Sequence, residues 1–334
     1  MVEKDFISRS LAFFTPKRRR FLRQLIGLGL IVLLAWQLSH GDQLVQWWQD
    51  LQRSLENGNA FTYLLPAVLL MPLNWTLETL KWRQLLGNSS GLSWRETWAS
   101  VLAGISVSLA TPNRIGEYGG RAMVAPVGQA VNIVWTSIIG SLCQWTAFVV
   151  CGWPSLCLWV QSWYNWSGIG TWLLALSLPA ILVVVWLVLF RMDLRSWLNQ
   201  KLHNYKWWRW LQLQLKGVAR ISTTAALRAL MLAIVRFVVY CFQFLLLLWF
   251  YGASLSLIDG ISGIFSIYLI QAGIPLPPGL SVISRSEIAV LFWDGIAVNP
   301  LTIVSATFSV YLLNLVVPAI LGAWVILRKN KHNR

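Results

Sequence analysis

Charged residues are scarce in this sequence of 334 residues: only 12% are Asp, Glu, Lys or Arg, whereas 57% are hydrophobic. A soluble domain carries roughly 25% charged and 45–50% apolar residues. Several apolar stretches also approach the ~20 residues with which a helix crosses ~30 Å of hydrocarbon. The sequence therefore predicts an all-α, polytopic membrane protein. We expect residues 1–334 to form a single membrane domain, embedded from about residue 21.

Residues that build metal sites and nucleophilic sites are also few. The three histidines are far apart in loops or tails, and the four cysteines lack CxxC spacing. The sequence therefore offers almost no suitably placed residues from which a zinc site or a nucleophile–base pair could be built. We expect no metal, no cofactor and no enzymatic activity. All cysteines lie in or near apolar segments, so we interpret them as small core residues: Cys143, Cys151, Cys157 and Cys241.

Acidic residues number 12 against 27 Lys and Arg, which gives a formal net charge of +15. The cations stand in blocks beside apolar segments, and this placement favours anionic lipid over nucleic acid. Many of the 22 Trp residues cluster at the ends of apolar segments, where their rings prefer the headgroup level. We therefore expect membrane lipids, mainly anionic ones, as partners and no nucleic acid.

Six apolar segments predict membrane spans: Leu25–Leu38, Phe61–Leu80, Trp135–Trp153, Trp172–Phe190, Ala229–Tyr251 and Leu301–Leu327. Cytoplasmic loops carry an excess of Lys and Arg. This rule places both termini, including the basic residues 1–20, and the stretch Arg191–Arg228 in the cytoplasm. It places the loops His40–Asn59 and Pro154–Ser167 outside. Within the basic stretch apolar residues recur at helical spacing, so an interfacial helix and a solvated loop both fit it.

If all blocks of basic residues are cytoplasmic, the regions 95–128 and 259–299 must each begin and end on the same side of the membrane. Each contains a proline break, Thr111–Gly116 in the first and Pro275–Gly279 in the second. Polar backbone freed by proline is tolerated at membrane depth only where protein buries it or a wet cavity receives it. Two broken segments that enter from opposite sides are typical of inverted-repeat transporters. The predicted fold is thus a helical membrane bundle with two broken or re-entrant segments, consistent with an inverted repeat.

Charged residues follow the first break at spacings of three and four. A helix that begins near Asn113 places Arg114, Glu117 and Arg121 on one face. In the functional interpretation, the helix N-terminus and Arg114 bind an anionic headgroup such as a lipid phosphate. The alternative is the start of a cytoplasmic helix with a surface salt bridge between Glu117 and Arg121.

The second break is followed by Ser284, Arg285 and Glu287, for which an ordinary extracellular loop is the alternative. Arg285 and Glu287 are two residues apart, so on a helix they face different partners. Because segments that enter from opposite sides converge, we expect the residues near both breaks to share one polar cavity.

Polar residues also occur inside the predicted spans: Glu78 with Asn74 in the second, Gln144 in the next, and Arg236 near the start of another. A charge at the membrane centre costs about 2.5–3.5 kcal/mol, so Glu78 and Arg236 should face the bundle interior. An ion pair between them fits this requirement, and snorkelling of Arg236 to the cytoplasmic surface is the competing interpretation.

The run from Thr111 to Arg121, TPNRIGEYGGR, resembles the central motif of the flippase-like membrane domain of lysylphosphatidylglycerol synthases and of its stand-alone bacterial relatives. The segments Asn74–Arg83 and Pro275–Glu287 resemble that family too, and the likeness extends from Leu25 to Leu327. It implies a helical fold with re-entrant segments and a role in moving lipids between leaflets. It does not imply aminoacylation, which in the synthases belongs to a separate soluble domain.

The function expected from these observations is a lipid transporter or flippase-like protein of a bacterial cytoplasmic membrane. Its substrate would be an anionic lipid or a lipid-linked sugar. The alternative is a non-transporting accessory subunit that presents lipid to a membrane-associated enzyme. An intramembrane enzyme with Glu78 or Glu117 as base is the weakest reading, because no nucleophile or metal constellation accompanies them.

Overall fold

The computed structural model describes residues 29, 43–58, 60–87, 91–111, 114–124, 129–164, 168–191, 221–274, 276, 278–293 and 298–328. Within these ranges every regular element is a helix, which confirms the predicted all-α class for the described part of the chain. In chain order the elements are α3 (Gln43–Glu56), the π-helical segment η1 (Ala60–Leu64), α4 (Leu65–Leu86), α5 (Trp94–Ser108), α6 (Gly116–Val124), α7 (Ala130–Tyr164), α8 (Ile169–Arg191), α11 (Thr223–Phe250), α12 (Leu257–Ala272), α13 (Pro278–Phe292), α14 (Pro300–Tyr311), the π-helical segment η5 (Leu312–Val316) and α15 (Val317–Arg328).

Four helical stretches of the described chain are long and apolar enough to cross a membrane: Ala130–Gln161, Ile169–Trp186, Thr223–Phe250 and Pro300–Arg328. They coincide with four of the predicted spans. Helices α3 and α4 form a pair bent by 109°, which makes a fifth candidate if the pair is one broken span. The predicted first span, Leu25–Leu38, lies outside the described residues. Length and composition therefore fit the described helices to a multi-pass membrane protein.

Two predicted loops are helical instead. Helix α3 occupies most of the predicted loop His40–Asn59, and it docks through Trp47, whose Nε1 donates to Ser309 Oγ at 2.8 Å. Helix α7 continues through Pro154 to Tyr164, where a loop was expected from Pro154 onward. Proline is tolerated inside membrane helices because neighbouring groups satisfy the freed backbone. The interfacial helix or loop expected in the basic stretch falls on residues 192–220, outside those described.

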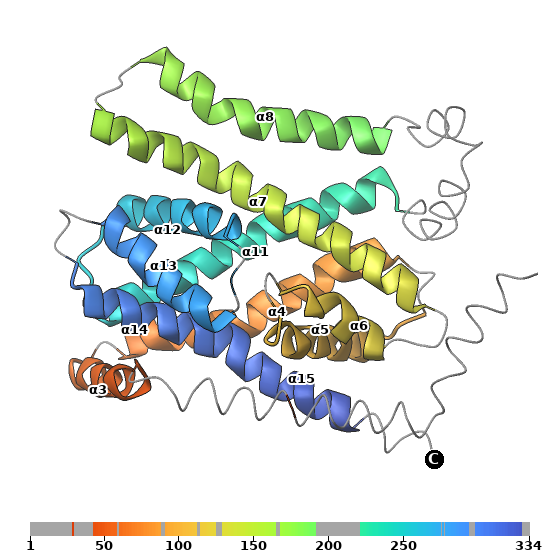
Figure 1. The fold of residues 1–334 in the computed structure, drawn as a ribbon, viewed down its shortest axis with the longest axis horizontal. Helices are drawn as coiled ribbons and strands as arrows, with labels where there is room; N and C mark the ends of the chain where they lie inside the picture. Colours follow the sequence, from red (N-terminus) through yellow and green to blue (C-terminus); the bar gives the residue numbers. More distant parts are fainter. Residues whose placement is uncertain are drawn as a thin grey trace, which may run out of the picture.

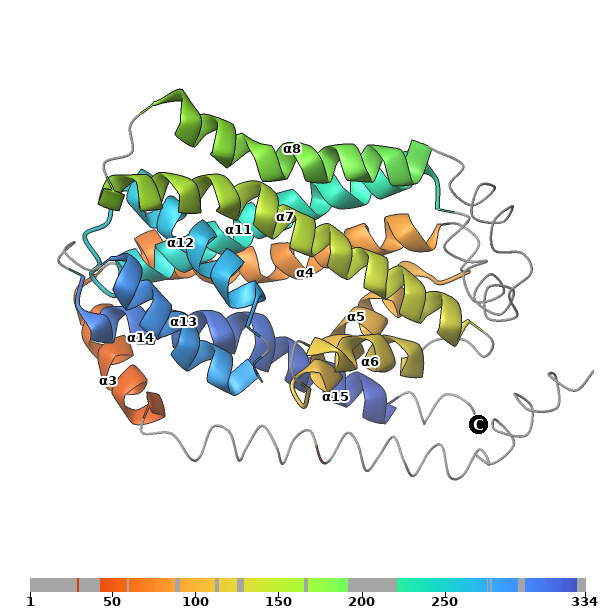
Figure 2. The ribbon, with the colours of Figure 1, turned by 45° about the horizontal axis from the view of Figure 1, so that its top comes forward.

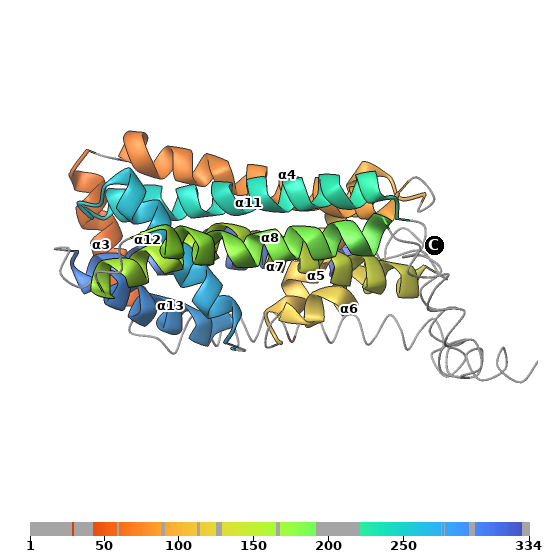
Figure 3. The same cartoon turned by 90° about the horizontal axis from the view of Figure 1, so that it is seen from above.

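The long helices run roughly along one axis of the bundle. Helices α4 and α11 lie side by side, and α8 is outermost and packs on α7 (Figures 1 and 3). Helices α8 and α15 end, and α11 begins, at the same end of the bundle (Figure 1). The helix ends that border the basic stretches are therefore gathered at one end, as the sequence requires if these stretches share one side of a membrane.

Two hairpins of short helices lie toward opposite ends of the bundle (Figures 2 and 3). Helices α5 and α6, with 15 and 9 residues, make one hairpin, and α12 and α13, with 16 and 15 residues, make the other. At 1.5 Å per residue, each helix is about 24 Å long or less, too short to span ~30 Å of hydrocarbon alone. Each hairpin turns at one of the predicted proline breaks.

Local sequence signals start these short helices. Ser93 and Glu96 form a capping box at α5: Ser93 Oγ accepts from the Glu96 backbone N–H at 3.3 Å, and Glu96 Oε2 accepts from the Ser93 N–H at 2.9 Å. Ser256 caps α12 by accepting from the Asp259 N–H at 3.1 Å. Both hairpins thus begin at side chains that satisfy otherwise unpaired backbone donors.

Glycines fix α5 between α6 and α15. A Cβ on Gly120 of α6 would lie 2.5 Å from the Ala103 carbonyl oxygen, and one on Gly322 of α15 would lie 2.0 Å from the Leu102 carbonyl oxygen. Only glycine permits such an approach to a backbone carbonyl. These contacts set the position of the first hairpin, and so the position of the charged residues that it carries.

Candidate functional site

Glu78 of α4 is a buried carboxylate shared by three basic side chains. Its Oε1 accepts from Arg121 Nη2 of α6 at 2.6 Å. Its Oε2 lies 2.7 Å from Lys81 Nζ and 3.1 Å from Arg236 Nη1 of α11. The ion pair expected between Glu78 and Arg236 is therefore present, and the cluster ties α4, α6 and α11 together.

Arg236 is also held from α7. Its Nη1 donates to Gln144 Oε1 at 2.7 Å. Both contacts draw the guanidinium into the bundle, so the snorkelling interpretation is wrong for this arginine. Gln144 is one of the polar residues noted inside the predicted spans, and its carbonyl oxygen orients a half-buried cation.

Arg121 is fully enclosed within the cluster, with 2% of its surface exposed. It pairs with Glu117 at the predicted spacing of four residues, and its guanidinium lies 4.9 Å from the centre of the Trp82 ring. A surface salt bridge was the alternative interpretation of the Glu117–Arg121 pair, and burial rules it out. The pair stabilises an interior, where a lost partner would leave an uncompensated charge.

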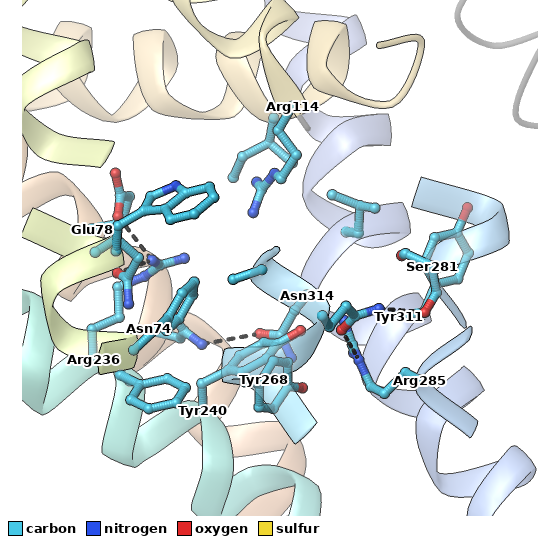
Figure 4. Close-up of a pocket in the computed structure, with 18 of the residues that line it drawn as sticks. Asn74, Glu78, Arg114, Arg236, Tyr240, Tyr268, Ser281, Arg285, Tyr311 and Asn314 are labelled. Carbon is cyan, nitrogen blue, oxygen red and sulfur yellow. Dashed lines mark hydrogen bonds and ion pairs between the residues drawn. The ribbon is translucent and has the colours of Figure 1, made fainter. Parts of the chain in front are cut away.

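Arg114 lies just before α6 rather than on its face. Helix α6 begins at Gly116, and Arg114 has a left-handed backbone with φ of 59°. Its Nη2 is 3.7 Å from Glu117 Oε2, and its side chain remains 42% exposed. In Figure 4 this side chain points into the pocket described next. Asn113, the predicted helix start, lies outside the described residues.

A cavity of about 250 Å³ lies between the two hairpins and the long helices (Figure 4). Its charged lining consists of Glu78, Arg114, Arg236 and Arg285, so cations outnumber carboxylates by three to one. Trp145 and Ile274 also line it and are 47% and 38% exposed, which gives the cavity an apolar rim. The interior is therefore electropositive, whereas the exposed edge suits hydrocarbon.

Arg285 of α13 lies across the pocket from Glu78 and Arg236 (Figure 4). Its Nε donates to Gln271 Oε1 at 2.7 Å, and its guanidinium lies 4.6 Å from the centre of the Tyr268 ring. Among the described residues no carboxylate lies within ion-pairing distance of Arg285. Its partners are neutral, so its charge is available to an anion in the pocket.

The predicted site residues thus divide into three groups. Glu78, Arg114, Arg236 and Arg285 line the pocket, and Glu117 and Arg121 adjoin it through the ion cluster. Ser284 and Glu287 are not among the lining residues, and Glu287 is exposed. Arg285 and Glu287 therefore face different ways, as their spacing predicts.

Sequence reasoning missed several neutral polar residues of the pocket, among them Tyr268, Gln271 and Asn314. Gln271 and Asn314 are single amides in apolar helices. This signal could have found them, because a polar group in a membrane interior is costly unless it has a partner or a function. The tyrosine offers no such signal, because tyrosine is common in helix packing.

No protein-family model, curated protein or solved structure matches the chain. Among the described residues no group of three or more His, Cys, Asp or Glu could hold a metal ion. The family resemblance stays a prediction, and the site is interpreted from its own geometry.

Proposed function

We propose that this protein binds the anionic headgroup of a membrane lipid in the pocket between the hairpins and moves the lipid between leaflets. The observation that carries this proposal is the contrast between the pocket's cationic lining and its apolar rim. An anionic lipid matches both parts of the pocket, because its phosphate complements the cationic lining and its chains suit the apolar rim. A free anion would gain nothing from Trp145 and Ile274 at the rim.

The two hairpins supply a route for transport. They lie toward opposite ends of the bundle, and residues at both turns, Arg114 in one and Ile274 and Leu276 in the other, line the same pocket. In this proposal they are re-entrant segments from opposite sides of a bacterial cytoplasmic membrane, with both termini in the cytoplasm. Movement of either hairpin would then expose the pocket to one leaflet, as in transporters with broken helices around a central site.

Purified full-length protein in vesicles tests this function. A fluorescent anionic phospholipid placed in one leaflet should become accessible in the other faster than in protein-free vesicles. Arg285→Gln should slow this exchange, whereas Arg53→Gln, at a side chain that is 73% exposed on α3, should not. Lipid that is bound but not moved would favour the accessory-subunit alternative. Absence of both binding and movement would refute the lipid proposal.

A further inference from the structure

Several buried polar atoms of the pocket residues have no hydrogen-bond partner among the described residues, and two of them belong to consecutive residues of one helix. These two are the Asn74 Oδ1 acceptor and the Trp75 Nε1 donor, both on α4. Asn74 and Trp75 are 1% and 6% exposed, so bulk water does not satisfy these atoms. Buried polar atoms are nearly always paired, and an unpaired one at a pocket wall calls for a ligand group.

The orientation of the Asn74 amide is fixed by a chain of other amides. Gln243 Nε2 donates at 2.8 Å to the Ala67 backbone carbonyl, which can only accept. Gln243 Oε1 must then accept, and it does so from Asn314 Nδ2 at 2.7 Å. Asn314 Oδ1 in turn faces Asn74 Nδ2 at 3.4 Å. The remaining atom, Asn74 Oδ1, is therefore held as an acceptor at the pocket wall (Figure 4).

The ligand group that meets Asn74 must donate a hydrogen bond, and the charge around the pocket decides its type. The lining and its ion cluster contain two carboxylates and five cations: Glu78 and Glu117, with Lys81, Arg114, Arg121, Arg236 and Arg285. This excess repels an ammonium group, whereas a hydroxyl carries no charge. A hydroxyl also accepts hydrogen bonds, so it can pair with Trp75 Nε1 as well.

We propose that Asn74 is a specificity-determining residue that selects lipids whose headgroup carries a hydroxyl beside the phosphate. The phosphate meets Arg285, which has no carboxylate partner among the described residues, and the hydroxyl meets Asn74 Oδ1 and Trp75 Nε1. This inference rests on the proposed function, because it specifies the headgroup that the same pocket takes.

Two phosphodiester lipids of equal charge test it. Phosphatidylglycerol carries hydroxyls on its headgroup and phosphatidylmethanol carries none. Binding of each to the full-length protein would be measured by native mass spectrometry from detergent micelles. Wild type should bind phosphatidylglycerol about tenfold more tightly than phosphatidylmethanol. A ratio of this size corresponds to one hydrogen bond whose loss leaves a buried polar group unpaired. Asn74→Leu, nearly the same size, removes the acceptor and should lower the ratio severalfold by weakening phosphatidylglycerol alone.

Further variants keep the test decisive. Trp75→Phe removes the indole donor while keeping an aromatic ring, and it should lower the ratio even if Asn74→Leu fails to fold. Thr76→Val is the matched control, because Thr76 Oγ1 donates to the Pro72 carbonyl of its own helix at 2.8 Å and does not line the pocket. A wild-type ratio near one, or a ratio unchanged in both pocket variants, overturns the role of Asn74 and leaves lipid binding standing. No binding of either lipid overturns the proposed function itself.

Discussion

Glu78 is the side chain on which the charges of the interior depend. Arg121, Lys81 and Arg236 all lie within 3.1 Å of its carboxylate oxygens. Arg121 has a second carboxylate in Glu117, but Lys81 and Arg236 have no other one among the described residues. Removing Glu78 would therefore leave buried cations without compensation.

We expect Glu78→Ala to lower the stability of the detergent-solubilised protein by about 3–5 kcal/mol, the usual effect of breaking a buried ion pair. A thermal unfolding curve followed by Trp fluorescence measures this change. Glu287→Ala removes an exposed carboxylate and should change stability by less than about 0.5 kcal/mol. Similar losses in the two variants would contradict the central role of Glu78.

Arg114 combines an unusual backbone with an exposed charge. Its φ of 59° is the sole positive value at a non-glycine position in the described ranges. An L-residue in this conformation costs about 1–2 kcal/mol relative to glycine. Glycine would relieve this strain, so we expect the guanidinium that points into the pocket to have a role other than stability.

Arg114→Gly and Arg114→Ala separate the backbone from the side chain. Both should weaken binding of anionic lipid to a similar degree, because both remove the guanidinium. The glycine variant should nevertheless be more stable than the alanine variant by about 1 kcal/mol, because it relieves the left-handed strain. Thermal unfolding measures the stability of each variant, and native mass spectrometry measures its lipid binding independently. Equal stabilities would show that the turn relaxes in the variants.

At the scale of elements, the backbone of helix α5 is approached closely by two neighbouring helices. Gly120 and Gly322 approach its carbonyls from two sides. The neighbouring Gly119 has open space where a Cβ would be. Two adjacent glycines of α6 thus have different roles, one for close packing and one without a packing constraint.

Alanine substitutions at these adjacent glycines should have opposite signs. Gly120→Ala forces a methyl group against the Ala103 carbonyl and should destabilise by about 1–3 kcal/mol. Gly119→Ala meets nothing and should stabilise by up to about 1 kcal/mol, because alanine favours a helix over glycine. The two thermal midpoints should therefore move in opposite directions from wild type. Matching shifts would show that α5 and α6 are not packed as described.

At the scale of the whole molecule, the bundle has two distinguishable ends. The α5–α6 hairpin lies toward the end at which α8 and α15 finish, and the α12–α13 hairpin lies toward the other (Figures 1 and 3). The first end borders the basic stretches of the sequence, and cytoplasmic loops carry the excess of Lys and Arg. We therefore expect that end to face the cytoplasm.

Single cysteines at two exposed positions test this orientation in intact cells. With the four native cysteines replaced, Glu56→Cys at the end of α3 should react with a membrane-impermeant maleimide. Arg95→Cys at the start of α5 should react only after the cells are permeabilised. The reverse pattern would invert the topology, and labelling of both positions from outside would disprove the assignment of the two ends.

Local spacing and apolar length determined several features from the sequence alone. The four helices that are long enough to span a membrane follow from long apolar runs, because a helix pairs the polar backbone groups of such a segment within itself. The Glu117–Arg121 pair and the divergence of Arg285 from Glu287 follow from the helical repeat. Pro154 misled the prediction, because a proline breaks a helix only weakly when neighbouring groups supply partners. The segment His40–Asn59 was expected to be a loop because it carries charged residues, although charged residues also occupy the polar face of a helix.

Only the tertiary structure decided which polar groups from different helices meet. Asn74 and Asn314 are 240 residues apart in the chain, and Arg236 and Gln144 are 92 apart. Such pairs leave no local pattern, because each amide or charge contacts its partner only after α4, α7, α11 and η5 have packed. Apolar length fixed which segments are long enough to cross a membrane. The packing of those segments fixed Glu78 as a shared counter-ion and left Asn74 Oδ1 facing the pocket.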